Sequence, residues 1–294
     1  MKKALITGIQ GQDGYYMDQL LKSKGYETIG IKKREHIDLL DKDVLFNLVS
    51  TTMPDEIYNF AGYSNVFNPW KDIDNIFDIN GRIPQYFLET ILKVNRSIKF
   101  FQASSCLIFG RDTSGFQDES TPHNPIHPYG IAKLYADNMI KEFRRVHGIF
   151  ACSGIFFPHE SPRRGDDFFT KKTINKIKEI KAGKAVALKI GNLNFFRDYG
   201  YAPDYMVAAH LMLQNNEPND YVIGSGKLIS GHDFVIECFK VADLDGTKYL
   251  QPDKTFYRDN DTEILKANIS KIKNDLGWTP THSIQEIIEI MMKY

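Results

Sequence analysis

The sequence is poor in cysteine and carries no net charge. Only three of its 294 residues are cysteines, and Cys106, Cys152 and Cys238 show no metal-binding spacing and leave an odd number for a disulfide framework. They fit a reducing cytoplasm, where each is expected to be a small buried apolar side chain. The 37 basic residues balance 37 acidic ones, so no basic surface for nucleic acid is indicated. Small molecules or further copies of the chain are the expected partners.

Long apolar runs are missing as well. No stretch is long enough to cross a bilayer, and the first residues, Met-Lys-Lys-Ala-Leu-Ile-Thr-Gly, enter a strand rather than a signal peptide. We therefore expect a cytoplasmic protein without membrane contact. The histidines His123, His127 and His232 have no second ligand at metal-binding spacing, so no metal site is expected.

What the chain does contain is an alternation of strand-like and helix-like segments. Strands are expected at 3–7, in a run ending at 31, and at 55–60, 97–103 and 150–156. Helices are expected at 14–25, 41–50, 83–93 and 129–146. This order predicts an α/β fold built on a doubly wound parallel sheet. After Phe157 the alternation becomes irregular, so 1–157 is the expected dinucleotide-binding domain and 158–294 a smaller, partly interleaved substrate lobe.

A glycine-rich turn follows the first expected strand directly. Gly8 permits a tight bend, Gly11 lets the backbone approach a pyrophosphate, and Gly14 allows close packing of the helix on the strand. The N-terminus of that helix, which includes Gln12 and Asp13, favours phosphate. A glycine triplet alone also fits an ordinary turn, but its position after the first strand favours a dinucleotide site.

Cations stand at the end of the second expected strand, where an acidic residue would select NAD. Lys32, Lys33 and Arg34 suit the 2′-phosphate of NADP, although a solvated basic loop gives the same pattern. NADP is therefore favoured and NAD stays open. Asp38 and Leu39 follow closely and are expected to contact the adenine end of the cofactor.

Three residues carry the chemistry expected of the first domain. Tyr129 and Lys133 are four positions apart, one helical turn, so the ammonium can lie beneath the phenol. A nearby cation favours the phenolate, which makes the tyrosine a usable proton acceptor. Ser105 ends an expected strand, where its hydroxyl could hold the reacting oxygen. Together they predict hydride transfer between a nicotinamide and an alcohol or ketone.

Several longer stretches extend this pattern over nearly the whole chain. They are Ala-Leu-Ile-Thr-Gly-Ile-Gln-Gly-Gln-Asp-Gly at 4–14, Pro-Asp-Glu-Ile-Tyr-Asn at 54–59, His-Glu-Ser-Pro-Arg-Arg-Gly at 159–165, Gly-Asn-Leu-Asn-Phe-Phe-Arg-Asp at 191–198 and Leu-Gly-Trp-Thr-Pro at 276–280. With them the chain resembles extended short-chain dehydrogenases/reductases, and among these the GDP-mannose 4,6-dehydratase family. The resemblance implies a GDP-sugar in the second lobe, with Arg164, Lys171, Arg197 and Arg258 facing its diphosphate or guanine.

The chain also departs from that family. The resemblance places Leu107 where the family has the glutamate that drives dehydration, and leucine cannot move a proton. Cys106 is adjacent, but neighbours on an extended segment point to opposite faces, so it is a poor substitute. Pro158 stands for a family asparagine and Pro203 for an arginine, which leaves the identity of the sugar open. The family's loop between Arg34 and Asp38 is missing.

Redox chemistry without elimination is the first hypothesis. The chain would oxidise the C4 hydroxyl of a GDP-linked mannose-type hexose or heptose to a ketone, with Ser105, Tyr129 and Lys133 as catalytic residues and NAD(P) as cofactor. Reduction of a GDP-4-keto sugar and C4 epimerisation would use the same residues. A nucleotide-binding scaffold without activity is disfavoured, because these three residues all remain. By the resemblance, a homodimer or higher homo-oligomer would form through helices near 71–93 and 129–146.

Overall fold

A six-stranded parallel sheet forms the first lobe. The computed structural model describes residues 1–32, 37–63, 70–110, 115–253 and 264–294. The strand order is β10-β5-β4-β3-β1-β2. The strands are β1 (Lys3–Thr7), β2 (Glu27–Ile31), β3 (Glu56–Asn59), β4 (Lys99–Ser105), β5 (Ala151–Phe156) and β10 (Tyr221–Ile223). The predicted doubly wound parallel sheet is confirmed, and its order reverses between β1 and β3.

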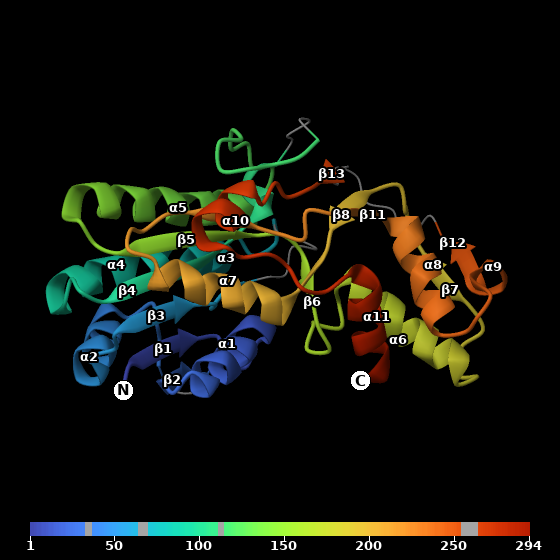
Figure 1. Ribbon diagram of the computed structural model, residues 1–294, viewed down its shortest axis with the longest axis horizontal. Coiled ribbons are helices and arrows are strands. Elements are labelled where there is room, and N and C mark those ends of the chain that lie inside the picture. The colour runs from blue at the N-terminus through green and yellow to red at the C-terminus, as the bar shows by residue number, and fades with distance from the viewer. Residues whose placement is uncertain (33–36, 64–69, 111–114, 254–263) are drawn as a thin grey trace.

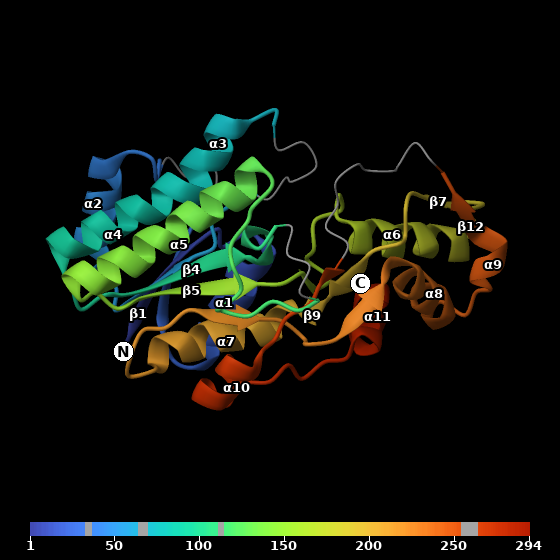
Figure 2. The ribbon, with the colours of Figure 1, turned by 90° about the horizontal axis from the view of Figure 1, so that it is seen from above.

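Helices cover both faces of this sheet (Figures 1 and 2). One layer holds α1 (Gln12–Ser23), α7 (Ala202–Gln214) and α10 (Ser270–Leu276), and the other holds α2 (Lys42–Thr52), α4 (Ile83–Val94) and α5 (Pro128–His147). Along β1, Ala4 and Ile6 pack on the α1 side while Leu5 packs on the α2 side. Because both faces are covered, Ala4, Leu5 and Ile6 are all apolar and buried, and the strand shows no alternation there.

The helix expected at 71–93 consists of three successive elements. α3 (Ile73–Phe77) is followed by a π-helical turn, η1 (Asp78–Arg82), which leads directly into α4. Gly81 lies in this turn, and a Cβ there would stand 3.2 Å from the ring of Tyr135 on α5. The missing side chain therefore lets the turn approach α5 closely, a packing constraint that the apolar periodicity did not indicate.

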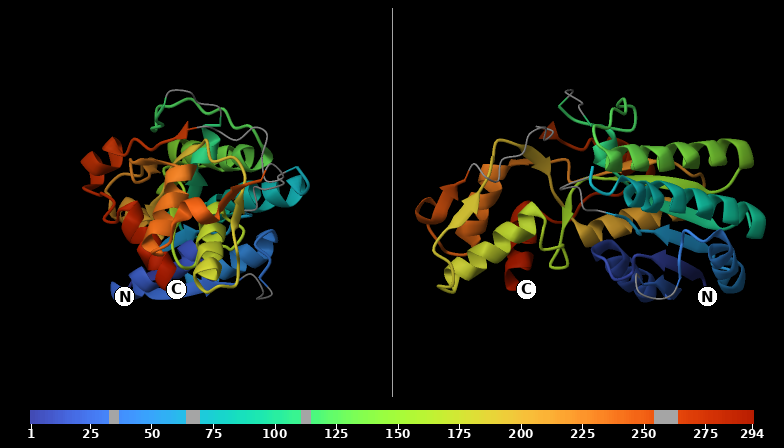
Figure 3. Two further views of the ribbon diagram at one scale, coloured as in Figure 1. Left: turned by 90° about the vertical axis from the view of Figure 1, so that its right-hand side faces the viewer. Right: turned by 180° about the vertical axis from the view of Figure 1, so that it is seen from behind.

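The second lobe lies beside the first (Figures 1 and 3). Its helices are α6 (Phe169–Lys181), α8 (Gly231–Val241), α9 (Gly246–Tyr249) and α11 (Ile284–Lys293). Short strands complete it, namely β6 (His159–Glu160) with β9 (Gly200–Tyr201), β7 (Leu188–Ile190) with β12 (Leu250–Pro252), and β8 (Phe196–Asp198) with β11 (Leu228–Ser230) and β13 (Ile264–Leu265). Ile174, Phe234 and Ile287, one from each of three helices, are buried in a shared core.

The chain returns from the second half to the first lobe. α7 packs on α1, and β10 joins the edge of the six-stranded sheet beside β5. The division of the chain at residue 157 stays a prediction. Segments after this residue, α7 and β10, pack in the first lobe. Within the described residues, no helix combines the length and apolarity that a membrane crossing would need.

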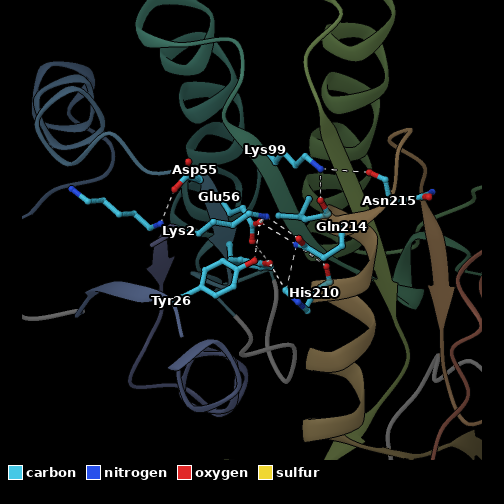
Figure 4. A network of polar contacts seen from close by, with 11 residues as sticks. Lys2, Tyr26, Asp55, Glu56, Lys99, His210, Gln214 and Asn215 are labelled. Atoms are coloured by element: carbon cyan, nitrogen blue, oxygen red, sulfur yellow. Dashed lines mark hydrogen bonds and ion pairs between the residues drawn. The ribbon is translucent and has the colours of Figure 1, made fainter. Parts of the chain in front are cut away.

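A buried carboxylate lies at the amino end of β3. Glu56 is 1% exposed, and its Oε1 accepts hydrogen bonds from the Lys2 ammonium at 3.0 Å and the Tyr26 hydroxyl at 3.1 Å (Figure 4). Gln214 also donates to this oxygen, and the Tyr58 hydroxyl donates to Oε2. Burial alone would raise the pKa of Glu56, but these bonds hold it below its usual value. The network joins the starts of three strands to α7.

Glu56→Gln is expected to lower the free energy of unfolding by about 2–3 kcal/mol near pH ~7. The reason is that a neutral amide has one acceptor oxygen, whereas the charged carboxylate accepts hydrogen bonds on both of its oxygens. Since the folded pKa is lowered, this stabilisation is present above the unfolded value of ~4.3 and is lost as the pH falls through the folded pKa. Denaturant unfolding across this range measures it, with the exposed Glu27→Gln as control. If the difference in the free energy of unfolding between the variant and wild type stayed constant down to low pH, the charge of Glu56 would not be the source of the stabilisation.

Candidate active site

A cleft of about 1760 Å³ lies between the two lobes. From the first lobe it is lined by the glycine-rich turn and by residues at the carboxyl ends of β4 and β5, including Ser105 and Phe156. From the second lobe it is lined by residues of α6, β7 and β8. The carboxyl ends of parallel strands, next to a reversal of strand order, are where ligands bind in such sheets.

The glycine-rich turn has the geometry of a pyrophosphate cradle. Gly8 has a φ of 67°, and a Cβ at this position would stand 2.9 Å from the carbonyl oxygen of Phe60. A Cβ at Gly14 would stand 2.4 Å from the Gly8 carbonyl oxygen. α1 starts after Gly11 without a side-chain cap, so the amides of its first turn are available at the cleft. These residues fit the diphosphate of a dinucleotide.

The side chains of this turn are bonded to the second lobe. Gln12 Nε2 donates to the carbonyl oxygen of His159 at 3.0 Å, and the Ser161 hydroxyl donates to Gln12 Oε1 at 2.8 Å. Asp13 Oδ1 lies 2.9 Å from His159 Nε2. Burial would raise the pKa of Asp13, yet His159 and Arg164 together hold it below its usual value. The His-Glu-Ser-Pro-Arg-Arg-Gly motif therefore fixes the predicted cofactor turn, a role of His159 that sequence reasoning missed.

Ser105, Tyr129 and Lys133 come together at the cleft floor. Ser105 is the last residue of β4, as predicted, and Tyr129 stands in the first turn of α5, whose start is capped by His127 accepting from the Gly130 amide. One turn later, Lys133 Nζ lies 5.6 Å from the centroid of the Tyr129 ring and donates to the carbonyl oxygen of Ala103 at 2.7 Å. The ammonium is thus fixed beneath the phenol.

The electrostatics of the three residues are set by their burial. Burial raises the pKa of Tyr129 above its ordinary value, while a hydrogen bond with the Ser105 side chain lowers it. Burial lowers the pKa of Lys133 to about 8, and the charge of Asp137 opposes that change. An ammonium next to the phenol favours the phenolate, the form that can accept a proton, so the charge of Lys133 acts against the effect of burial on Tyr129.

The segment after Ser105 differs from the expectation. It is not extended, because Cys106–Ile108 form a 3₁₀ turn that begins with Ser105 Oγ accepting from the Leu107 amide at 3.3 Å. The argument from opposite strand faces is therefore wrong, and both Cys106 and Leu107 line the cleft. Burial raises the pKa of the Cys106 thiol to about 12, so this thiol is no proton acceptor at neutral pH.

The carbonyl oxygen of Leu107 approaches Gly130 so closely that a Cβ on this glycine would stand 2.6 Å from it. The backbone of Leu107 therefore packs against Gly130, the residue that follows Tyr129 in the sequence, and the apolar side chain of Leu107 lines the cleft. Pro158 also lines the cleft, whereas Pro203, in the first turn of α7, does not.

Two of the predicted substrate-binding cations line the cleft. The Arg164 guanidinium lies 3.6 Å from the Phe168 ring centroid, and its Nε is 3.4 Å from Glu160 Oε2. Glu160 thus braces the arginine next to it. Arg197 is 8% exposed, and its Nη1 donates to the carbonyl oxygen of Phe196 at 2.9 Å. Both guanidinium groups are thus positioned by contacts within the protein.

The other predicted cations are placed differently. The Lys171 ammonium donates to the carbonyl oxygen of Pro162 at 2.9 Å, and Lys171 is not among the residues that line the cleft. Lys172 and Lys176, one turn apart on α6, line the cleft instead. Their i, i+4 spacing was the signal available in the sequence. Lys33, Arg34 and Arg258 lie outside the described residues.

The adenine end of the expected cofactor site is also at the cleft. Lys32, Asp38 and Leu39 line it. Asp38 Oδ1 accepts a hydrogen bond from the Leu40 amide at 2.9 Å, which fixes the carboxylate at the end of the loop that follows β2. The predicted residues of this end that the structure describes therefore share one wall of the cleft.

Relatives with known names decide the family. A family model described as GDP-mannose 4,6 dehydratase matches residues 5–291. The chain belongs to this family. GDP-mannose 4,6 dehydratase 1 of Arabidopsis thaliana is 34% identical over 321 residues, which cover 99% of this chain and 89% of that protein. GDP-mannose 4,6-dehydratase of Vibrio cholerae is 33% identical over 345 residues, with 99% and 93% covered.

Solved structures agree on the fold. The structure of RMD from Pseudomonas aeruginosa complexed with NADPH has a TM-score of 0.89 at 20% identity and covers 100% of this chain and 98% of that chain. UDP-glucose 4-epimerase from Thermotoga maritima has a TM-score of 0.88 at 20% identity, with 99% and 98% covered. The predicted resemblance is confirmed, and the chain is an enzyme of the extended short-chain dehydrogenase/reductase type.

Proposed function

We propose that this enzyme oxidises the C4 hydroxyl of a GDP-linked mannose-type hexose or heptose to a 4-keto sugar without removing water. One observation carries the proposal. Ser105, Tyr129 and Lys133 meet at the cleft, while the next positions, Cys106 and Leu107, bring a protonated thiol and an alkyl group. Redox chemistry at one carbon needs only the first three residues, whereas dehydration needs a further acid or base beside them.

Oxidation at C4 removes one proton and one hydride from the sugar. Tyr129 accepts the proton of the C4 hydroxyl as phenolate, the C4–H bond breaks, and the C4–O single bond becomes a carbonyl. A bound nicotinamide supplies the acceptor for the hydride. Ser105 holds the reacting oxygen by a hydrogen bond, and the Lys133 ammonium keeps the phenol acidic enough to exchange its proton.

The nucleotide part of the substrate is proposed from the family and the cations. The two curated relatives are named for GDP-mannose. Arg164 and Arg197 line the second-lobe side of the cleft, where guanidinium groups match diphosphate oxygens, and Lys172 adds a further positive charge. Arg258 stays a predicted member of this set. The same arrangement serves a hexose or a heptose, because it addresses the nucleotide and not the sugar.

NADP is the cofactor favoured by this proposal, on the strength of Lys32 at the cleft and the neighbouring Lys33 and Arg34. RMD from Pseudomonas aeruginosa was solved with NADPH, while a dTDP-glucose 4,6-dehydratase from Bacillus anthracis was solved with NAD. A homodimer through α4 and α5 and a cytoplasmic location complete the proposal.

Mass spectrometry of the sugar nucleotide tests the proposal directly. The enzyme is incubated with GDP-mannose, and separately with a GDP-heptose, together with NAD⁺ or NADP⁺. Loss of two hydrogens from the sugar with formation of reduced nicotinamide is expected. Loss of water at an enzymatic rate would overturn it. An inverted C4 alcohol would identify an epimerase, and activity only with a 4-keto sugar and reduced cofactor would identify a reductase.

A further inference from the structure

A second buried carboxyl group lies behind the catalytic residues. Asp137 is on α5, one helical turn beyond Lys133, and is 2% exposed. The Ser104 hydroxyl, next to the catalytic Ser105 on β4, donates to Asp137 Oδ2 at 2.5 Å. Tyr129, Lys133 and Asp137 therefore follow one another along the same side of α5, at i, i+4 and i+8.

The environment of Asp137 is apolar apart from a few defined groups. Burial raises its pKa to about 6, and the hydrogen bond from the Ser104 hydroxyl on β4 opposes that change, while the other carboxylate oxygen, Oδ1, makes no hydrogen bond within the described residues. Among charged groups, Asp220 before β10 raises this pKa and Lys141 on α5 lowers it. The carboxyl group is thus a buried acid that its partner Ser104 helps to keep ionised near neutral pH.

Lys133 lies one helical turn before this carboxylate on the same side of α5. Lys133 is 4% exposed, and its ammonium makes one described hydrogen bond, to the Ala103 carbonyl oxygen. Burial favours the neutral amine, and the two charges that oppose burial are Asp137 on its own helix and Asp13 on α1. Asp13 is already paired with His159, whereas Asp137 lies one helical turn from Lys133 on the same helix, with Lys141 as the other cation that acts on it.

We propose that Asp137 is a positioning residue: its carboxylate, held by the Ser104 hydroxyl, keeps Lys133 in the ammonium form beneath Tyr129. It acts through Lys133 and touches neither substrate nor cofactor. Removing the charge of Asp137 lowers the pKa of the buried Lys133 further, so that more of it is neutral. A neutral lysine no longer favours the tyrosinate. The inference rests on the proposed function for the roles of Tyr129 and Lys133.

Asp137→Asn tests the charge while preserving the size of the side chain. With oxidised cofactor bound, the ionisation of Tyr129 is followed by tyrosinate absorbance, as the difference from the same protein carrying Tyr129→Phe. We expect ionisation to move upward by about one pH unit, and kcat near pH ~7 to fall about tenfold with KM unchanged. Asp18→Asn is the matched control, since that buried carboxylate bonds Thr28 and Lys22 away from the cleft.

Ser104→Ala gives an independent and milder test. The carboxylate stays, but without the hydroxyl its pKa rises above about 6, so loss of activity is expected only at the acidic side and is reversed as the pH increases. An unshifted Tyr129 titration in folded Asp137→Asn would overturn the inference. If that variant does not fold, a Ser104→Ala profile that parallels wild type at all pH values would overturn it.

The two proposals fail in different ways. If wild-type enzyme oxidises no GDP-sugar, the proposed function is wrong, yet the absorbance titration still measures how Asp137 affects Tyr129. If oxidation occurs and the titration is the same in both proteins, Asp137 has only a structural role.

Discussion

Replacing Tyr129 with phenylalanine is expected to reduce kcat for sugar oxidation on the order of 10³-fold, because the variant keeps the ring and loses the group that takes the proton. The Tyr129 side chain is buried in the cleft beside Ser105, and Lys133 lies on its ring face. The positions that follow Ser105, Cys106 and Leu107, bring a protonated thiol and an alkyl group to the cleft. The initial rate of reduced nicotinamide formation at saturating GDP-sugar measures the loss.

Tyr135→Phe provides the matched control on the same helix. The Tyr135 hydroxyl donates to Gln85 Oε1 at 2.6 Å, and Tyr135 is not among the residues that line the cleft. Its loss should leave kcat within about twofold of wild type, since only an ordinary neutral hydrogen bond is removed. A Tyr129→Phe enzyme that kept a tenth or more of the wild-type rate would show that another group takes the proton.

The parts of this site that depend on local sequence could be predicted. The end of β4 at Ser105 followed from an apolar β-rich run, and the approach of Lys133 to Tyr129 followed from helical spacing. The glycine turn followed from its place after β1. Each of these relations spans few residues, so the periodicity of the backbone is enough to derive it.

The parts of the site that depend on segments far apart in the sequence could not be predicted. The pairing of Asp13 with His159 joins residues far apart in the sequence, and no pattern in either segment specifies it. The orientation of the Lys171 side chain depends on the backbone of the preceding loop, because its ammonium donates a hydrogen bond to the Pro162 carbonyl oxygen. The 3₁₀ turn at Leu107 depends on contact with Gly130 on α5. Such features are set by how the elements pack and not by their own propensities.

Leu107→Glu is expected to introduce dehydration of a GDP-mannose substrate, because position 107 lines the same cleft as Tyr129 and its carbonyl oxygen packs against Gly130, the residue that follows Tyr129. The residue lines the cleft and is half-buried, so a carboxyl group there would have a raised pKa and could exchange a proton near neutrality. After oxidation at C4, the proton at C5 is acidic, and a base beside it permits loss of the C6 hydroxyl. If the hydride taken from C4 is then returned to C6 and a proton to C5, the oxidised cofactor is regenerated and a sugar lighter by one water is the expected product.

Leu107→Gln separates the acid–base role from the effect of a polar side chain of similar size. The glutamine variant should yield the dehydrated sugar at a rate at least about tenfold lower than the glutamate variant, since an amide transfers no proton. Product mass at matched turnover, with Tyr129 intact in both proteins, makes the comparison independent of the first oxidation. If wild type already released the dehydrated sugar, or if the glutamate and glutamine variants gave equal amounts, the apolar side chain at 107 would not be what stops the reaction at the ketone. A strong difference between them would assign the choice between oxidation and elimination to a single side chain next to the catalytic tyrosine.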